Sequence, residues 1–139
     1  MTGNPFTGKW SYRSFYNDPD LSKDLKDLVL GSGTLDIQEV SSTVLGGSIG
    51  GSDWQLSLHG SFGYGSPMQV HFRGKGLVGG EEWIYDYIGW LVPAWPNSDS
   101  TLQANAIVGS VTRIISHSSS SGGVSPAGVV GSFYAVQTS

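Results

Sequence analysis

Residues 81–96, EEWIYDYIGWLVPAWP, decide the fold. They hold three of the five tryptophans of the chain, and we interpret them as a β-strand. Successive side chains of a β-strand point to opposite faces. As a strand, this stretch has two apolar faces, with Trp83, Tyr85, Tyr87 and Leu91 on one and Ile84, Ile88 and Trp90 on the other. Two apolar faces indicate burial on both sides. We expect one face to meet the interior and the other a neighbouring subunit, and the sequence leaves open which is which.

The same period-two alternation continues on either side of this stretch. Alternating segments cover residues 8–15, 33–40, 43–50, 54–60, 68–73, 105–115 and 129–136. Most connections between them are short and rich in glycine, as in hairpins. Eight strands without a crossover helix predict an all-β fold, an eight-stranded antiparallel up-and-down barrel, in which the first and last strands pair and leave no exposed edge. A two-sheet sandwich is the alternative.

One segment, near residues 20–28, breaks the alternation. Leu21, Leu25 and Leu28 recur there at spacings of four and three, and Asp20 is in position to cap a helix. This pattern predicts a short helical turn, whose expected role is to cover one end of the barrel.

The composition is typical of one compact β domain over residues 1–139. Hydrophobic residues make up 38% of the chain and charged residues only 13%, the reverse of a disordered sequence. The net charge is −4 and the seven Lys and Arg are scattered, so we expect no nucleic-acid partner. The absence of cysteine excludes disulfides and thiolate-ligated metals. Because no apolar run is long enough to span a bilayer and the N-terminus lacks the layout of a signal peptide, we expect no membrane partner and a cytoplasmic location.

Three places in the sequence resemble the calycin-type barrels, the lipocalin and avidin group. Residues 8–10, Gly-Lys-Trp, are similar to the Gly-x-Trp of the first strand in that group, whose tryptophan closes the barrel floor. Residues 85–87, Tyr-Asp-Tyr, resemble the Thr-Asp-Tyr motif of lipocalins, and Arg113 resembles the arginine that packs over the first-strand tryptophan. The long C-terminal helix of lipocalins has no counterpart here. The resemblance implies the barrel and, as a family tendency, binding of a small molecule, although a fold does not fix a function.

An aromatic pocket follows if the face that carries Trp83 points inward. The candidate ligand-binding residues are then Tyr12, Trp54, Phe72, Trp83, Tyr85 and Tyr87. An apolar cavity with few polar groups is the kind that small-molecule sites favour. We therefore expect the protein to bind a small hydrophobic or aromatic molecule without a cofactor. The alternatives are a small cofactor-free isomerase or cyclase that uses the same cavity, and a filled barrel with a structural or assembly role.

Asp86 is unusual because it is an acidic residue within an apolar strand. A carboxylate that is buried without a partner is costly or becomes protonated. We expect an ion pair with Arg113 or Arg13. The alternative is a general acid or base with a raised pKa, which makes Asp86 the candidate catalytic residue.

The three histidines suggest no metal centre. His59 and His71 lie on the polar faces of two successive strands, where they are possible cross-strand neighbours. Without a fixed third ligand we expect no metal site. His117 precedes a serine-rich loop and is predicted to be exposed.

Strands 81–91, 105–115 and 127–137 carry apolar residues on both faces. A soluble monomer rarely exposes a large contiguous apolar surface. We therefore expect a symmetric homo-oligomer, a dimer or a tetramer, with these three strands at the interface.

Overall fold

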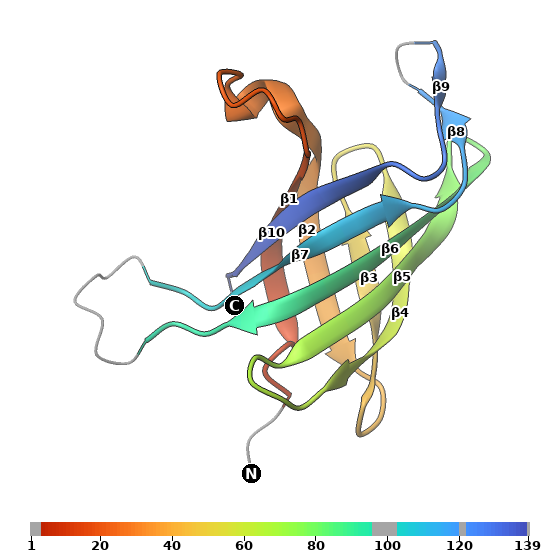
Figure 1. The fold of residues 1–139 in the computed structure, drawn as a ribbon. Helices are drawn as coiled ribbons and strands as arrows, with labels where there is room; N and C mark the ends of the chain where they lie inside the picture. The colour runs from red at the N-terminus through yellow and green to blue at the C-terminus, as the bar shows by residue number, and fades with distance from the viewer. Residues whose placement is uncertain (1–3, 96–102, 120–121, 139) are drawn as a thin grey trace.

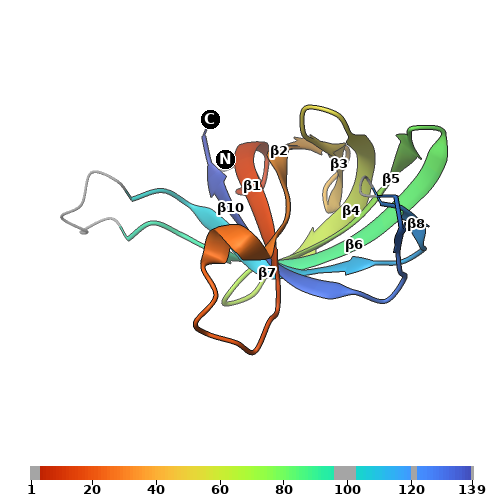
Figure 2. The ribbon, with the colours of Figure 1, turned by 90° about the horizontal axis from the view of Figure 1, so that it is seen from above.

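The structure, a computed structural model, describes residues 4–95, 103–119 and 122–138. Eight long strands form one closed antiparallel barrel (Figures 1 and 2). These strands are β1 (Gly8–Tyr16), β2 (Val29–Glu39), β3 (Val44–Gly50), β4 (Gln55–Gly63), β5 (Gln69–Val78), β6 (Glu81–Val92), β7 (Ala106–Arg113) and β10 (Val130–Gln137). The predicted eight-stranded antiparallel barrel is therefore confirmed, and the sandwich alternative is wrong.

The barrel closes where the first strand pairs with the last. β1 and β10 run antiparallel, with Tyr12 opposite Ala135 and Ser14 opposite Phe133. On its other side β1 pairs with β2, and that ladder shifts register after Ser14. Because each of the eight strands has a partner on both sides, none of them is an edge strand.

The connections define two ends of the barrel. We call the end with the β1–β2, β3–β4, β5–β6 and β7–β10 connections the mouth, and the opposite end the base. The β7–β10 connection contains two short strands, β8 (His117–Ser118) and β9 (Val124–Ser125), which pair with each other. Figure 1 shows this pair at the mouth and the N-terminal segment at the opposite end.

The base is filled with side chains. Trp10 and Phe6 are fully buried there, and the Trp10 Nε1–H donates a hydrogen bond of 3.0 Å to the Phe6 carbonyl oxygen. The Phe6 and Phe62 rings pack with their centroids 5.9 Å apart. Trp10 thus occupies the barrel floor, as the resemblance implies. Arg113 is at the other end, because β7 begins at the base and ends at the mouth, so the implied packing of Arg113 over Trp10 is wrong.

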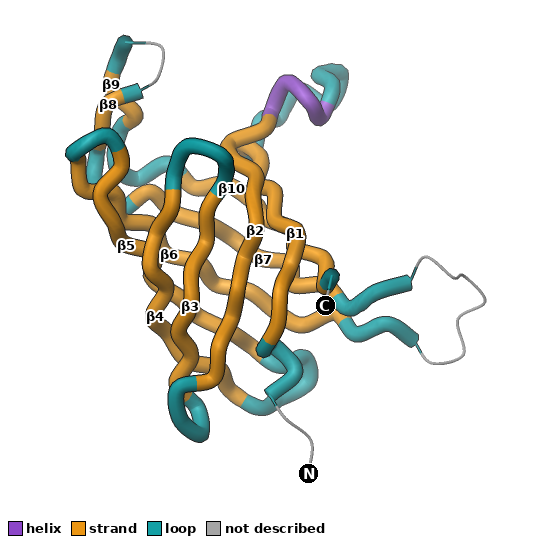
Figure 3. Tube along the Cα trace, turned by 180° about the vertical axis from the view of Figure 1, so that it is seen from behind, coloured by secondary structure: helices purple, strands orange, loops and turns teal. Residues whose placement is uncertain are grey.

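The predicted helical turn is present as a single 3-10 turn, η1 (Leu25–Leu28), between β1 and β2 (Figure 3). None of its four residues is buried, so the turn adds no side chain to the core. Asp20 does not cap it; the Asp20 carboxylate instead accepts hydrogen bonds from Ser22. Among the described residues, no helix has the length and apolar character needed to cross a bilayer.

β6, β7 and β10, which have apolar residues on both faces, each turn one face toward the interior. The interior receives Trp83, Tyr85, Tyr87 and Leu91 from β6, Ile107, Val111 and Arg113 from β7, and Phe133 and Ala135 from β10. Gly109 on β7 lies opposite Gly89 on β6. A Cβ atom at Gly109 would overlap the carbonyl oxygen of Ile88. This oxygen belongs to the backbone, so a change of side-chain rotamer cannot relieve the overlap. Two strands that approach this closely leave no room for a side chain.

We expect Gly109→Ala to lower the free energy of unfolding by about 1–3 kcal/mol, because the added methyl forces β6 and β7 apart. Urea denaturation measures the change. The matched control is Gly63→Ala, also in a strand, where an added Cβ has no neighbour within 4 Å. Equal effects of the two substitutions would show that the close approach of the strands is wrong.

Candidate functional site

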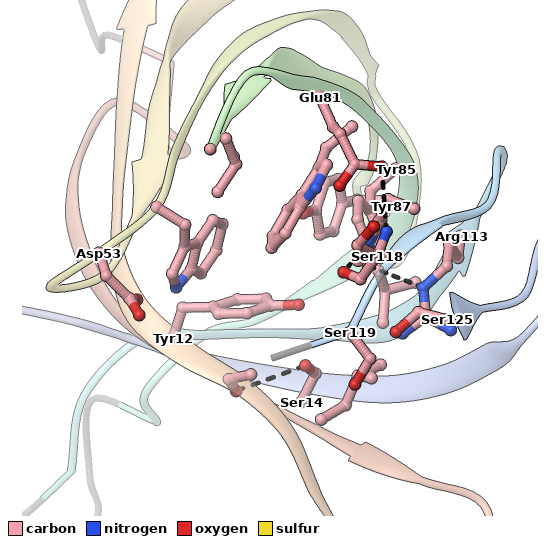
Figure 4. Close-up of a pocket in the computed structure, with 18 of the residues that line it drawn as sticks. Tyr12, Ser14, Asp53, Glu81, Tyr85, Tyr87, Arg113, Ser118, Ser119 and Ser125 are labelled. Atoms are coloured by element: carbon pink, nitrogen blue, oxygen red, sulfur yellow. Dashed lines mark hydrogen bonds between the residues drawn. The ribbon is translucent and has the colours of Figure 1, made fainter. Parts of the chain in front are cut away.

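A cavity of about 520 Å³ occupies the mouth half of the barrel (Figure 4). This volume is in the range of small-molecule sites. Most of the barrel strands contribute to its lining, which consists of Tyr12, Ser14, Tyr16, Leu30, Gly31, Asp53, Trp54, Val78, Gly79, Glu81, Trp83, Tyr85, Tyr87, Val111, Arg113, His117, Ser118, Ser119 and Ser125. The lining combines aromatic rings with polar side chains, among them Asp53, Glu81, Arg113 and His117.

The structure brings five of the six candidate ligand-binding residues to this cavity. They are Tyr12, Trp54, Trp83, Tyr85 and Tyr87. Phe72 also points inward and is buried, but it is packed in the core and does not line the cavity. Alternation along a strand indicates the face on which a residue lies and not its depth along the barrel axis. The sequence pattern therefore does not distinguish Phe72 from the inward residues that line the cavity.

Aromatic rings form the floor of the cavity. Tyr12 and Tyr87 meet edge to face with ring centroids 6.0 Å apart, and Phe133 packs against both, at 5.6 and 6.0 Å. Burial raises the pKa of both tyrosines above the ordinary value of 10.0. The floor therefore presents neutral phenols, which donate hydrogen bonds and carry no charge.

One wall is a row of aromatic rings that includes His117. The imidazole stacks on the indole of Trp83, with centroids 4.0 Å apart and planes 13° apart, and Trp54 lies 6.5 Å beyond Trp83. His117 is only 6% exposed, so its predicted exposure is wrong. The serine-rich sequence around His117 carries no local signal for this burial, because the ring is covered by a residue of β6 and not by its own neighbours.

The β7–β10 connection is tied to the barrel at several points, which positions His117. The backbone N–H of Arg113 donates to the Val129 carbonyl at 2.9 Å, and the N–H of Gly128 donates to the Arg113 carbonyl at 2.7 Å. Farther along, the Ser118 N–H donates to the Glu81 carboxylate at 3.1 Å. The hydrogen bonds from Ser118 lower the pKa of Glu81, so this carboxylate remains charged as an acceptor.

A chain of hydrogen bonds links three polar side chains at the wall. The Nε–H of Arg113 donates to the Tyr85 hydroxyl at 2.8 Å, and this hydroxyl lies 2.7 Å from Nε2 of His117. Nδ1 of His117 is 3.0 Å from the carbonyl oxygen of Ser118. Because a carbonyl only accepts, Nδ1 carries a hydrogen, and Nε2 is the atom that meets the Tyr85 hydroxyl. Burial raises the pKa of the Tyr85 phenol despite the opposing effect of Arg113.

Arg113 lines the cavity and is only 4% exposed. Its Nη1 donates to the Pro126 carbonyl at 3.2 Å, and the centre of its guanidinium lies 5.7 Å from the centroid of the Tyr85 ring. The described part of the chain places no carboxylate within ion-pair distance of it. The sequence did not identify Arg113 and His117 as cavity residues. The place of Arg113 in the cavity follows from the pairing of β6 with β7, which sets Arg113 opposite Tyr85.

Asp86 lies on the outer face of β6 and not in the cavity lining. Its carboxylate accepts hydrogen bonds from Nε and Nη2 of Arg73 at 2.8 and 3.1 Å. The predicted ion pair with Arg113 or Arg13 is therefore wrong in its partner. A carboxylate on the outside of the barrel does not reach a molecule held inside it.

His59 and His71 also lie on the outer face. His59 is opposite Arg73 and His71 is opposite Ser61 in the β4–β5 ladder. The described residues contain no group of three His, Cys, Asp or Glu side chains that could hold a metal ion.

The comparisons with known proteins gave no match to a family model, a curated protein or a solved structure.

We expect Tyr85→Phe to lower the free energy of unfolding by about 1–3 kcal/mol, because it leaves Nε of Arg113 and Nε2 of His117 without a partner in a buried position. Chemical denaturation measures the loss. The control is Tyr64→Phe, which removes a hydroxyl from a ring that is 78% exposed and should change little. Equal losses would mean that the buried Tyr85 hydroxyl contributes no more to stability than an exposed one.

Proposed function

We propose that the protein binds a small, largely apolar molecule in the mouth cavity. The observation that carries this proposal is the cavity itself, about 520 Å³ between an aromatic floor and an aromatic wall. Flat rings bury large areas of a ligand at low conformational cost, and the polar groups of the lining supply orientation. The closed barrel is compatible with the resemblance to the lipocalin and avidin group, which supports the proposal by analogy of fold alone.

The cavity counts against a barrel filled by its own side chains. A second candidate, a cofactor-free isomerase or cyclase, is favoured by one observation. Tyr85 lines the cavity and its hydroxyl is hydrogen-bonded to His117, an arrangement in which the phenol and the imidazole can exchange a proton with a bound molecule. Asp86 does not serve this role, because it lies outside the cavity. Conversion of a bound molecule, and not its mere retention, separates the enzyme from the binding protein.

The binding proposal is tested with N-phenyl-1-naphthylamine, an uncharged probe whose fluorescence increases in apolar sites. We expect saturable binding to the wild-type protein. Gly31→Phe should fill the cavity from β2, because a Cβ at Gly31 has only the Ser14 hydroxyl nearby, at 3.6 Å. Loss of space for one apolar ring should weaken binding at least about tenfold.

The control for this experiment is Gly63→Phe, which adds the same ring on β4 in open space. It should leave the affinity for the probe unchanged. If the wild-type protein binds no probe, or if the two variants bind equally well, the cavity is not a binding site for apolar molecules.

We also propose that the chain forms a symmetric homo-oligomer through the outer faces of β6, β7 and β10. Trp90, Val108 and Tyr134 lie side by side across these strands and are 39%, 37% and 42% exposed. The segments 88–92, 106–110 and 132–136 carry no charged residue. A second copy of the same surface thus meets no like charge when a two-fold axis brings the two together.

We expect sedimentation at micromolar concentration to give a mass of at least two chains. Trp90→Lys should reduce it to one chain, because the ammonium group would be buried against an apolar surface. Val40→Lys, at an exposed position on the other side of the barrel, is the control and should not change the mass. A monomeric wild-type protein would contradict this proposal.

A further inference from the structure

We infer that the molecule bound in the mouth cavity carries an anionic group, a carboxylate or a related oxyanion, and that Arg113 binds this group. The inference rests on the proposed binding function and specifies the class of its ligand.

The first observation is the uncompensated charge of Arg113. A guanidinium that is 4% exposed has lost nearly all of its hydration, which is costly unless an opposite charge replaces the water. The ion pairs of the described residues are Lys23–Asp18, Lys26–Asp24, Arg73–Asp86 and Lys75–Glu82, and none includes Arg113. The two other described arginines are more exposed, so Arg113 differs from both in its burial.

The second observation is the number of unused donors. An arginine has five N–H groups in a planar fork that matches two oxygens of a carboxylate. In the described structure Nε donates to Tyr85 and Nη1 donates to Pro126. The remaining N–H groups belong to a side chain that lines the cavity, so they are available to an acceptor that enters it.

The third observation is the distribution of charge around the cavity. Figure 4 shows Arg113 beside Ser118 and Ser125, with Asp53 across the cavity. The side of the cavity that holds Arg113 therefore combines a buried cation with the hydroxyls of Ser118 and Ser125. The other acidic residue of the lining, Glu81, is also on this side, but its carboxylate is exposed and already accepts the Ser118 N–H. An anionic group fits this side, while the apolar body of the ligand fits against the aromatic wall and floor.

Arg113 also has a structural contact, its hydrogen bond to Pro126 in the β7–β10 connection. A residue that only holds this connection would affect stability and the binding of all ligands alike. A residue that binds an anion distinguishes a charged ligand from its uncharged analogue. The test must therefore measure a ratio of affinities.

Two fluorescent probes provide this ratio. 8-Anilinonaphthalene-1-sulfonate has the aromatic skeleton of N-phenyl-1-naphthylamine with one added sulfonate. Since hydrogen bonds to a charged group exceed neutral ones, we expect the wild-type protein to bind the sulfonate about 10- to 100-fold more tightly than the uncharged probe. This comparison requires no variant, so it remains decisive even if substitutions at position 113 prevent folding.

Arg113→Gln should then reduce the ratio of the two affinities to about one, whatever its effect on the affinity for the uncharged probe. The matched control is Arg73→Gln, which removes an arginine from the outer face and should preserve the preference. Circular dichroism confirms that each variant is folded before it is titrated.

The outcomes distinguish failure of the inference about Arg113 from failure of the proposed binding function. Preference for the sulfonate that is lost in Arg113→Gln and kept in Arg73→Gln supports the inference. Equal binding of the two probes by the wild-type protein, or a preference that survives in Arg113→Gln, overturns the inference but leaves the proposed function intact. Binding of neither probe overturns the proposed function, and the inference fails with it.

Discussion

The pairing of β1 with β10 is the constraint on which the rest of the structure depends. It joins the two ends of the strand series, so that none of the eight barrel strands is an edge strand, and the eight strands set the width of the barrel. An eight-stranded interior is wide enough for packed side chains or for one small ligand. This barrel contains both: aromatic and aliphatic side chains fill the base, while the mouth half keeps an open volume. Closure therefore creates the cavity.

The polar side of the cavity shows how the fold tolerates buried polar groups. Each of Arg113, Tyr85 and His117 has a hydrogen-bond partner, so the network is costly to interrupt at any single member. The same network connects the β7–β10 connection to β6, since His117 lies on the former and Tyr85 on the latter. Stability of the mouth and the chemistry of the cavity are thus properties of the same three residues.

Much of the fold was predictable, because alternation is a local property of the chain. The spacing of Trp83, Tyr85 and Tyr87 placed them on one face, and the structure has that face inside. Asp86 was also within reach of the sequence: the Gly79-Gly80 turn pairs residue 78 with residue 81, and counting outward from it sets Arg73 opposite Asp86. The burial of His117 was not predictable, because it depends on how a long connection folds back onto β6. To predict that Arg113 lies at the mouth, one must know that β7 runs from the base, where Trp10 lies, to the mouth.

Nuclear magnetic resonance tests the closure of the barrel most directly. Pairing of β1 with β10 predicts nuclear Overhauser effects between the backbone protons of Tyr12 and Ala135, and of Ser14 and Phe133, together with slow amide exchange along both strands. If these cross-strand contacts are absent and the β1 and β10 amides exchange as fast as those of a solvent-exposed edge, the barrel is open and no cavity of this kind exists.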